Sequence, residues 1–436
     1  MKSGTKLSKM ILKDLSCCIL AAGEGSRMNT EIPKVLHRVY KKPLISYVLD
    51  TIKTLKIKKI VTVLGYKARE VEGYVEKDSQ IVIQRRLLGT ADALRQAKRE
   101  LTTTKGHLLV LCGDTPLISP ETLVKLINHH ISSGASCTVL TALLRNPTGY
   151  GRIIRNDKGL IVKIIEEKNA SLYEKVIEEV NTGIYCFKNK DLFSSLDEIR
   201  LDNIKREYYL TDIVQILVKK GRKVESLQSD VAEEVLGVNT REELTNIHRL
   251  LRIRVQKRII SQGVTIVDPE TTHIDEGVEI GKDTIIEPFV RIEEDVKIGK
   301  HCLIGPFTHI RPKTTIKDRV KLGNFVEVVR STIDSGTKVN HHSYIGDSEI
   351  GKNVNIGAGT ITANYDGDKK NKTIIKDGAF IGSGSILVAP VKIGKNAITG
   401  ANCVVNKKDV EDNTVVVGVP ARLLRKRKRI EIRDEG

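Results

Sequence analysis

Apolar residues return at six-residue intervals through the second half of the chain. The interval holds without a break at Ile274, Ile280, Ile286, Ile292, Ile298, Ile304, Ile310, Ile316, Leu322 and Val328. After one slip it resumes at Ile333, Val339 and Ile345, then at Ile350 and Ile356, and later at Ile381, Leu387 and Ile393. A period of six fits neither a helix nor a simply alternating strand. It predicts hexapeptide repeats, in which three hexads form one triangular coil of a parallel β-helix with the aliphatic side chains pointing inward.

The first half of the chain alternates short apolar runs with helical patterns. The clearest runs are C-C-I-L-A-A (17–22), K-I-V-T-V-L (59–64), Q-I-V-I (80–83) and H-L-L-V-L-C (107–112). Helical periodicity between them is clearest in I-S-Y-V-L-D-T-I-K-T-L (45–55). This alternation predicts a mainly parallel sheet covered by helices.

Two further segments mark the organisation of the chain. Residues 241–260 carry one apolar helical stripe, formed by Leu244, Ile247, Leu251, Val255 and Ile259. We therefore predict an α/β domain at 1–241, a linker helix at 242–262 and a β-helix domain at 263–436. Residues 362–371 interrupt the six-residue period and predict a projecting loop, which is either decoration or a functional lid.

Composition and charge exclude several classes of protein. With 40% hydrophobic and 29% charged residues, the 436-residue chain has no apolar run long enough to span a bilayer, and its N-terminus does not resemble a secretory signal. The seven cysteines form no C-x-x-C pair, which favours a reducing cytosol over disulfides or zinc. The net charge of +18 is spread along the chain except for a basic tail, and no nucleic-acid-binding motif accompanies it. Anionic small substrates, or simply a basic surface, explain the charge at least as well as nucleic acid.

A candidate anion-binding turn follows the first apolar run. In G-E-G-S-R-M-N-T-E-I-P-K, Gly23 and Gly25 allow a sharp turn with exposed amides, and Arg27 and Lys34 add two cations. The stretch is not a Walker loop and lacks the third glycine of the dinucleotide fingerprint, so a structural turn would explain the glycines alone. Asp114 follows the run at 107–112, at the edge where open α/β sheets bind ligands.

Several motifs extend this pattern in a fixed order. They are L-A-A-G-x-G-S-R-M followed by P-K, then Q-R-R-L-L-G-T-A-D-A-L, C-G-D-T-P-L, P-T-G-Y-G-R-I, I-I-E-E-K, V-N-T-G-I and G-V-N-T-R. Together they resemble the sugar-phosphate nucleotidyltransferases. With the repeats, nearly the whole chain resembles the bacterial bifunctional N-acetylglucosamine-1-phosphate uridylyltransferase/glucosamine-1-phosphate acetyltransferases. The resemblance implies an α/β protein, in which a Rossmann-like nucleotidyltransferase domain precedes a left-handed parallel β-helix of hexapeptide repeats.

The resemblance also implies roles for individual residues of the first domain. Arg27 and Lys34 would act on the phosphates as catalytic cations, and Asp114 and Asn239 would bind Mg²⁺. The remaining nucleotide-binding residues would be Leu20, Ala21, Ala22, Gly23, Gln84, Gly89 and Thr90, and those holding the sugar phosphate would be Gly151, Glu166, Asn181 and Asn239. Pyrophosphate would leave UTP as the sugar phosphate attacks in line, without a covalent intermediate.

The β-helix contains a second group of motifs. These motifs resemble the acetyltransferase half of the same family. They are H-I-R-P, G-N-F-V-E, H-H-S-Y-I-G-D, N-V-N-I-G-A-G-T and A-N-Y-D-G. That half commonly forms trimers that bind acyl-CoA between neighbouring prisms. The resemblance selects His341, three residues before Tyr344, as the base, because an imidazole can take a proton from an ammonium near neutral pH. His342 would be a bystander or would orient its neighbour.

The same resemblance supplies the binding residues of this half. Arg311, Tyr344 and Asn355 would bind glucosamine 1-phosphate, and Asn364 would serve that substrate or acetyl-CoA. The acetyl-CoA groove would be lined by Ala358, Asn364, Tyr365, Ser383, Ala401 and Arg422.

Three positions depart from the family pattern. Cys112 replaces a tyrosine before Gly-Asp, Val329 replaces a phosphate-binding lysine, and Gly418 replaces an arginine that binds acetyl-CoA. Arg330 could substitute for the lysine, although neighbouring strand residues point to opposite faces. Two alternatives therefore stay open: a nucleotidyltransferase whose β-helix is only a trimerising or regulatory scaffold, and a non-catalytic assembly protein.

Overall fold

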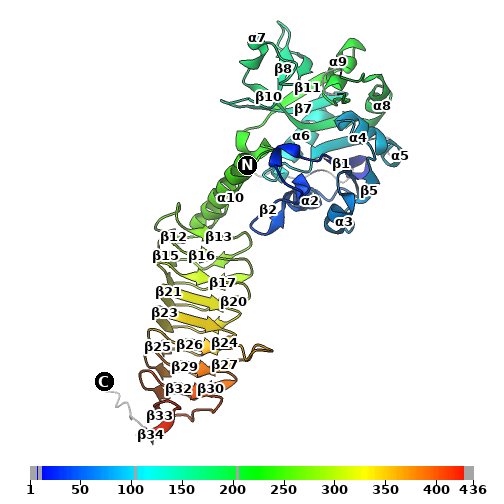
Figure 1. The fold of residues 1–436 in the computed structure, drawn as a ribbon. Coiled ribbons are helices and arrows are strands. Elements are labelled where there is room, and N and C mark those ends of the chain that lie inside the picture. Colours follow the sequence, from blue (N-terminus) through cyan, green and yellow to red (C-terminus); the bar gives the residue numbers. More distant parts are fainter. Residues whose placement is uncertain (1–6, 8–11, 103–105, 203–205, 427–436) are drawn as a thin grey trace. The chain divides into compact units, whose positions relative to one another are not determined.

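The computed structural model describes residues 7, 12–102, 106–202 and 206–426, and the chain divides into two compact units, 1–250 and 251–436 (Figure 1). The predicted helix is α10 (Arg241–Ser261), and all five residues of its apolar stripe are buried. The three-part domain division stays a prediction. No helix in the described part of the chain combines the length and the apolar composition needed to cross a bilayer.

The first unit is built on a mixed sheet. Four parallel strands lie in the order β6-β1-β4-β5, namely β6 (His107–Cys112), β1 (Leu15–Ala21), β4 (Lys59–Leu64) and β5 (Gln80–Ile83). These are the four predicted runs, and β1 and β6 are buried almost throughout because helices cover both of their faces. The other half contains β10 (Glu179–Lys188), which runs antiparallel to both β6 and β7 (Cys137–Leu143). The remaining strands are β8 (Gly151–Arg155), β9 (Ile161–Ile165) and β11 (Val224–Gln228).

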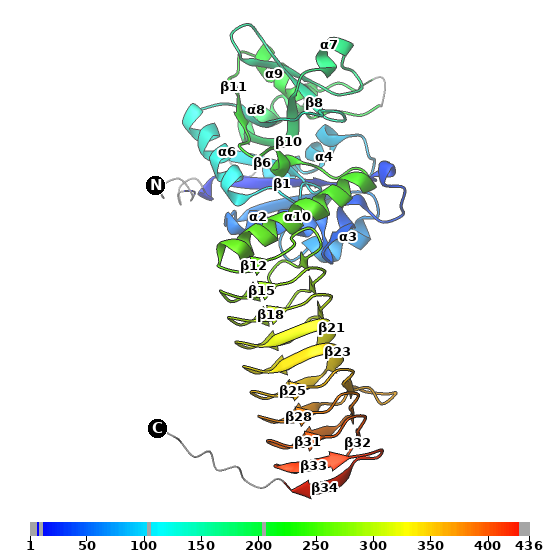
Figure 2. The same cartoon turned by 90° about the vertical axis from the view of Figure 1, so that its left-hand side faces the viewer.

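Helices cover the two faces of this sheet and create two hydrophobic cores (Figure 2). One core contains residues of α2 (Leu44–Thr54), α3 (Ala68–Val75) and α6 (Pro120–Ser133). The other contains residues of α4 (Thr90–Gln96), α5 (Lys98–Leu101), α8 (Asn189–Phe193) and α9 (Asp212–Lys219). Successive residues of β1, such as Cys18 and Ile19, contribute to opposite cores, because side chains along a strand alternate between the two faces of the sheet. The short elements are η1 (Ser26–Met28), η2 (Lys34–Leu36), β2 (Arg38–Val39), β3 (Lys42–Pro43), α7 (Leu172–Lys175), η3 (Leu196–Glu198) and η4 (Ala232–Val235).

The second unit is a parallel β-helix with three faces (Figure 2). The first face stacks β12 (Thr265–Ile266), β15 (Ile285–Ile286), β18 (Leu303–Ile304), β21 (Lys321–Val329), β23 (Lys338–Gly346), β25 (Asn355–Ile356), β28 (Phe380–Ile381), β31 (Ile398–Thr399) and β33 (Thr414–Val417), and ends with the antiparallel β34 (Arg422–Lys426). The second face stacks β13 (His273–Ile274), β16 (Arg291–Ile292), β19 (His309–Ile310), β26 (Ile361–Ala363), β29 (Ile386–Val388) and β32 (Val404–Asn406), together with the ends of β21 and β23. The third stacks β14 (Glu279–Ile280), β17 (Val296–Ile298), β20 (Thr314–Ile316), β22 (Thr332–Ile333), β24 (Ser348–Ile350), β27 (Thr373–Ile375) and β30 (Val391–Ile393).

The aliphatic residues of the six-residue period form the interior of the prism. All the residues predicted to point inward are buried, and they belong to one continuous core. The slip in the period is caused by a shortened coil. Ile298 and Ile316 pair in successive coils and are 18 residues apart, whereas Ile316 and its partner in the next coil, Ile333, are 17 residues apart. The interruption at 362–371 projects between β26 and β27, where Tyr365 and Lys370 form an isolated antiparallel bridge (Figure 1).

Candidate active sites

The loop after β1 is folded back by a left-handed turn at Gly25. Gly25 has a φ of +72°, and a Cβ there would lie only 2.6 Å from the Cβ of Lys34. Glycine is therefore required for the two ends of the loop to meet. The amide of Met28 donates to the Gly25 carbonyl at 2.9 Å and closes η1. This fold brings Arg27 and Lys34 to one cavity.

The cavity has a volume of about 450 Å³ and lies where β1, β5 and β6 end. It collects all the residues that the sequence assigned to the nucleotide, the phosphates and the metal: Leu20, Ala21, Ala22, Gly23, Arg27, Lys34, Gln84, Gly89, Thr90, Asp114 and Asn239. These residues come from four separate segments. They meet because the carboxyl ends of parallel strands share one edge of the sheet.

Lys34 joins the two predicted metal ligands. Its ammonium forms a short ion pair with the Asp114 carboxylate and donates to Oδ1 of Asn239 at 3.0 Å. The backbone amide of Val238 donates to the Asp114 carbonyl at 3.0 Å and holds the two segments together. One cation thus already lies against two oxygen ligands on nearly buried side chains. Mg²⁺ prefers such hard oxygens and completes its shell with water and substrate phosphates, so the pair fits the predicted ion.

Cys112 also lines the cavity, at the end of β6. Burial raises the pKa of its thiol to about 12, with a further contribution from the Asp114 carboxylate. Its Sγ would lie 3.1 Å from a Cβ on Gly183, so the thiol packs closely against β10. Cys112 is therefore a neutral, polarisable wall of the site and not a nucleophile.

The predicted sugar-binding residues form an adjoining cluster on the second half of the sheet. Asn181 pairs with Gly151 across β10 and β8, and Glu166 directly follows β9, which is paired to β8. A Cβ on Gly151 would lie 3.6 Å from the Asn181 Cβ, so the cluster is tight. Glu166 accepts a hydrogen bond from Thr211 Oγ1 at 2.9 Å. None of Gly151, Glu166 and Asn181 lines the nucleotide cavity itself.

Sequence reasoning missed two residues that lie between these groups. Glu207 and Tyr209 line the cavity. Burial raises the pKa of the Tyr209 hydroxyl, and the carboxylates of Glu207 and Glu166 add to the effect. Tyr209 is therefore a neutral donor between the nucleotide cavity and the sugar cluster. No spacing signal marked it, because its segment reaches the site through tertiary hydrogen bonds, such as those of Tyr208 with Leu88 and Ala91 and of Leu210 with Thr90.

In the β-helix, the two adjacent histidines have different surroundings. His341 Nδ1 lies 2.7 Å from Oδ1 of Asn324, its partner in the register of β21 and β23. His342 stacks on Phe325 with ring centroids 4.9 Å apart. It ends a ladder of stacked rings, continued by Phe307 and Phe289 at 5.1 and 4.8 Å. His341 is exposed and oriented by an amide, whereas His342 is a stacking residue.

Below His341, the same corner of the prism carries small residues. Ala358, Ser383 and Ala401 occupy equivalent positions in successive coils, as the registers of β25, β28 and β31 require. The Gly384 amide donates to the Ala358 carbonyl at 2.7 Å, and the Asn402 amide donates to Ser383 at 2.7 Å. The stacked rings belong to the neighbouring column of His342, whereas the column of His341 has Asn324 on one side of the histidine and these small residues on the other.

The column ends near a cation. Gly418 has a φ of +94°, and its neighbour Val417 pairs with Arg422 of β34. Arg422 is exposed. A positive charge is therefore present beside Gly418, although it comes from the following strand.

Two of the predicted sugar-phosphate residues of this unit lie on the adjoining face, since Arg311 follows β19 and Tyr344 lies where β23 pairs with β26. The Arg311 guanidinium donates to Glu327 at 2.8 Å, and Glu327 pairs in register with Tyr344. A Cβ on Gly346 would lie 2.7 Å from the Tyr344 hydroxyl and 2.7 Å from Nδ2 of Asn364. Glycine at 346 therefore leaves room for both polar groups above the backbone. Asn355 and Tyr365 lie in β25 and the projecting loop, and Tyr365 is 61% exposed.

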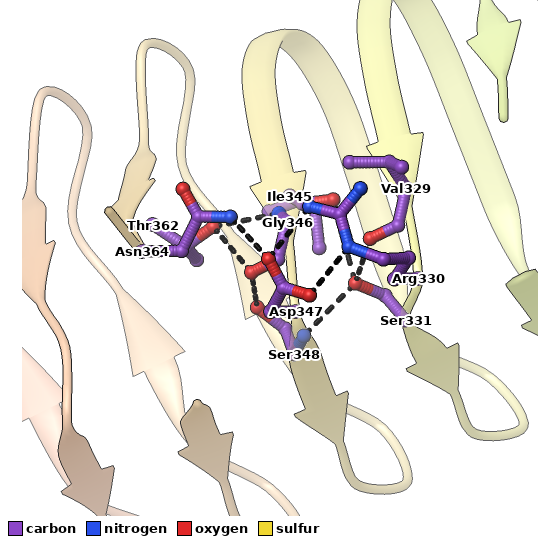
Figure 3. Close-up of polar contacts among 9 residues, drawn as sticks. All are labelled: Val329, Arg330, Ser331, Ile345, Gly346, Asp347, Ser348, Thr362 and Asn364. Carbon is purple, nitrogen blue, oxygen red and sulfur yellow. Dashed lines mark hydrogen bonds and ion pairs between the residues drawn. The ribbon is translucent and has the colours of Figure 1, made fainter. Parts of the chain in front are cut away.

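A charged network centred on Asp347 includes Asn364 of this cluster (Figure 3). Arg330 donates from Nε and Nη2 to the two oxygens of Asp347 at 2.6 and 2.7 Å, and Asn364 forms a short bond to the same carboxylate. Hydrogen bonding to Asp347 raises the pKa of Arg330, and Arg330 in turn lowers the pKa of Asp347. Lys370 of the projecting loop also lowers the pKa of Asp347. Sequence reasoning missed Asp347 and Lys370, since only the stacking of coils brings them together.

Strand alternation does not decide the direction of the Arg330 side chain, contrary to the expectation from the sequence. Strand alternation applies up to Val329, which ends β21 and is 2% exposed. Arg330 lies beyond the strand and has a φ of +48°, so its direction is set by the corner and not by the pleat. Its guanidinium meets Asp347 beside Asn364 (Figure 3).

Comparisons with known proteins agree across both units. Residues 16–232 match the family described as nucleotidyl transferase, and residues 295–330 and 372–407 match bacterial transferase hexapeptide (six repeats). Three relatives bear the name Bifunctional protein GlmU. The protein from Listeria monocytogenes serotype 4b is 43% identical over 91% of this chain and 94% of its own. The proteins from Pelotomaculum thermopropionicum and Shouchella clausii are 46% and 42% identical, over 87% and 88% of this chain and 90% and 92% of their own.

Proposed function

This chain belongs to the family of bifunctional GlmU proteins, and we propose that each of its two units carries one of two successive transfer reactions. The protein is a bifunctional enzyme of UDP-N-acetylglucosamine synthesis. Glucosamine 1-phosphate first receives an acetyl group from acetyl-CoA. The product then receives a uridylyl group from UTP, and pyrophosphate leaves. The observation that carries this conclusion is the similarity to bifunctional relatives over about nine-tenths of the chain.

Uridylyl transfer is assigned to the cavity at the end of β1. Arg27 and Lys34 supply two cations where a triphosphate needs charge neutralisation, and Gly23 offers backbone amides. Gly151, Glu166 and Asn181 would hold the sugar so that its phosphate faces the α-phosphorus. Catalysis then consists of positioning and electrostatic stabilisation, which phosphoryl-type transfer mainly requires.

Mg²⁺ would be held by Asp114 and Asn239. Their oxygens already converge on the Lys34 ammonium. When bound, the ion would neutralise the negative charge that develops on the phosphates. Lys34 would then turn towards the phosphates. The same side chain would thus pair with Asp114 when the metal is absent and with the phosphates when the metal is bound.

Acetyl transfer is assigned to His341. Because Asn324 Oδ1 accepts from Nδ1, the neutral ring carries its proton on Nδ1 and its lone pair on Nε2. Nε2 can then take a proton from the ammonium of glucosamine 1-phosphate, and the free amine attacks the thioester. The column of Ala358, Ser383 and Ala401 next to His341 supports their assignment to the acetyl-CoA groove, with Arg422 near its end.

Val329 occupies the position at which the family pattern has a phosphate-binding lysine. The cation that would bind the phosphate of glucosamine 1-phosphate is therefore assigned to Arg330. Asp347 accepts from Nε and Nη2, and Tyr344 interacts with the same guanidinium, so a ligand would meet Arg330 beside Tyr344 through the N–H donors that remain. Arg311, Tyr344, Asn355 and Asn364 would complete the site. Lys370 adds a second positive charge beside the same carboxylate.

Three broader features are proposed on the same basis. The nucleotidyltransferase domain would end at 241, a linker helix would occupy 242–262, and the acetyltransferase domain would begin at 263. The hexapeptide repeats support a homotrimer, which a single-chain mass in analytical ultracentrifugation would contradict. Seven free cysteines support a reducing cytoplasmic location, which cell fractionation can check.

One assay tests the division of labour. The purified protein is incubated with acetyl-CoA, glucosamine 1-phosphate, UTP and Mg²⁺, and released thiol and pyrophosphate are measured separately. We expect His341→Ala to abolish thiol release while pyrophosphate is still formed from added N-acetylglucosamine 1-phosphate. Asp114→Ala should have the opposite effect.

The neighbouring histidine provides the matched control. His342→Ala removes a ring of the same kind from the next position, but one that only stacks on Phe325. It should leave thiol release within about fivefold of the wild type, since a stacking pair contributes about 1 kcal/mol. Equal loss of thiol release in both variants would contradict the role of His341. Pyrophosphate formation without any thiol release by the wild type would favour the β-helix as a scaffold only.

A further inference from the structure

The side chain of Gln84 is held from outside the nucleotide cavity. Its Nε2 donates to the Gly89 carbonyl at 3.1 Å and to Oδ2 of Asp92 at 2.7 Å. Gln84 lines the cavity and is only 4% exposed. Asp92 does not line that cavity. It lies in the first turn of α4 and borders a separate hollow with Arg85, Arg86 and Gln96.

These two contacts determine which way the Gln84 amide faces. A backbone carbonyl and a carboxylate can only accept hydrogen bonds, so the NH₂ group must point towards them. The reversed amide would place its oxygen against two acceptors. Oε1 is therefore directed away from Gly89 and Asp92, and no residue in the described part of the chain donates to it.

Both anchors are themselves fixed. Gly89 has a φ of +96°, and a Cβ there would lie 2.6 Å from the Tyr208 carbonyl, so the loop is pressed against a neighbouring segment. The Gly89 carbonyl also accepts from the amide of Ala93 in α4 at 3.1 Å. Asp92 lies in the same helical turn. The amide of Gln84 is thus clamped by the start of one helix.

We propose that Asp92 is a positioning residue that sets the preference of the enzyme for a uracil base. This inference rests on the proposed assignment of Gln84 to the base of UTP. With its NH₂ engaged, Gln84 presents an acceptor, which suits the N3–H donor of uracil. Cytosine carries a lone pair at N3, so an acceptor there repels it. Freed from Asp92, the amide could turn and donate to cytosine instead.

A purely structural role for Asp92 makes a different prediction. A carboxylate in the first turn of a helix stabilises the helix dipole, and its loss would lower the Tm of the protein. It would not change the ratio of two nucleotides that differ only in the base. The ratio of kcat/KM for UTP to that for CTP is therefore the informative measurement.

The test uses full-length protein with N-acetylglucosamine 1-phosphate, Mg²⁺ and either UTP or CTP. Asp92→Leu removes the acceptor at similar size, and we expect the preference for UTP over CTP to fall about tenfold, which is the worth of one charge-assisted hydrogen bond. The loss should lie in KM for UTP, with kcat within about twofold, because Asp92 does not touch the reacting groups. Asp92→Asn keeps an oxygen that can accept from Gln84 and should retain most of the preference.

Two further variants make the result decisive. Gln96→Ala removes a residue that also donates to Asp92, at 3.3 Å, but does not contact Gln84, and it should leave the ratio unchanged. Asp92→Ala replaces Asp92→Leu if the latter does not fold. An unchanged UTP-to-CTP ratio in the folded variant, or an equal loss with both nucleotides, would overturn the inference. Failure of the wild type to form pyrophosphate from UTP would instead overturn the proposed function.

Discussion

At the residue scale, the clearest prediction for the acetyltransferase half concerns the proposed phosphate contact of Arg330, next to Val329, which stands where the family pattern has a lysine. Val329 is buried, whereas the neighbouring Arg330 turns the corner and is held by both oxygens of Asp347. Arg330→Ala should raise KM for glucosamine 1-phosphate about tenfold or more, because a charge-assisted contact to phosphate is lost. KM for acetyl-CoA and the release of pyrophosphate should not change. Steady-state kinetics of thiol release measure the effect.

The backbone at this position calls for a second variant. Since Arg330 has a φ of +48°, glycine relaxes the corner while it also removes the cation. Arg330→Gly and Arg330→Ala should therefore show the same rise in KM. A normal KM in the glycine variant would mean that Arg330 only shapes the corner, and the phosphate contact would then have to be sought at Lys370.

At the scale of elements, α6 is joined to the central sheet by a pair of histidines, the buried His130 and the half-buried His107. His130 of α6 lies 3.0 Å from Nδ1 of His107 at the start of β6, and its own Nδ1 lies 2.9 Å from Thr138 of β7. Burial lowers the pKa of His130 to about 3, and repulsion from His107 adds to the effect. The folded state therefore keeps His130 neutral, whereas the unfolded chain binds a proton near the ordinary value of 6.5.

This difference predicts a loss of stability in acid. The free energy of unfolding should be insensitive to His130 above about pH 6.5 and should decrease as the pH falls towards 3, by up to about 1.4 kcal/mol per pH unit. His130→Gln keeps hydrogen-bonding groups but cannot titrate, so its urea midpoint should fall less steeply between neutral pH and about pH 5. Parallel curves for the two proteins would contradict the prediction.

The elements also show how far sequence reasoning reaches. The β-helix was predictable because every interior position repeats the same local rule, and even its slip reflects one shortened coil between Ile316 and Ile333. The parallel strands were predictable from their apolar runs. The antiparallel orientation of β10 was not predictable, since the direction of a strand depends on which strands it pairs with. The same reason hid Asp92, Asp347 and Lys370, whose roles arise only from contacts across elements.

At the scale of the whole molecule, the two reactions differ in their expected need for a metal. In the nucleotidyltransferase unit, Asp114 and Asn239 converge on one cation, and a triphosphate adds further negative charge. The proposed acetyltransferase site would instead rely on the imidazole of His341 and the fixed charges of Arg311 and Arg330. Proton removal from an ammonium and attack on a thioester require no metal when a base is in place.

Removal of divalent metal should therefore stop one reaction and spare the other. With excess EDTA, the full-length protein should release thiol from acetyl-CoA at its normal rate, while pyrophosphate formation from UTP falls at least about a hundredfold, as loss of a charge-stabilising ion implies. N-acetylglucosamine 1-phosphate should then accumulate, and added Mg²⁺ should restore its conversion. The Asp114→Ala protein should resemble the wild type in EDTA and should not recover. If EDTA stopped both reactions equally, a metal would serve the β-helix as well, and the assignment of the ion to Asp114 and Asn239 alone would have to be abandoned.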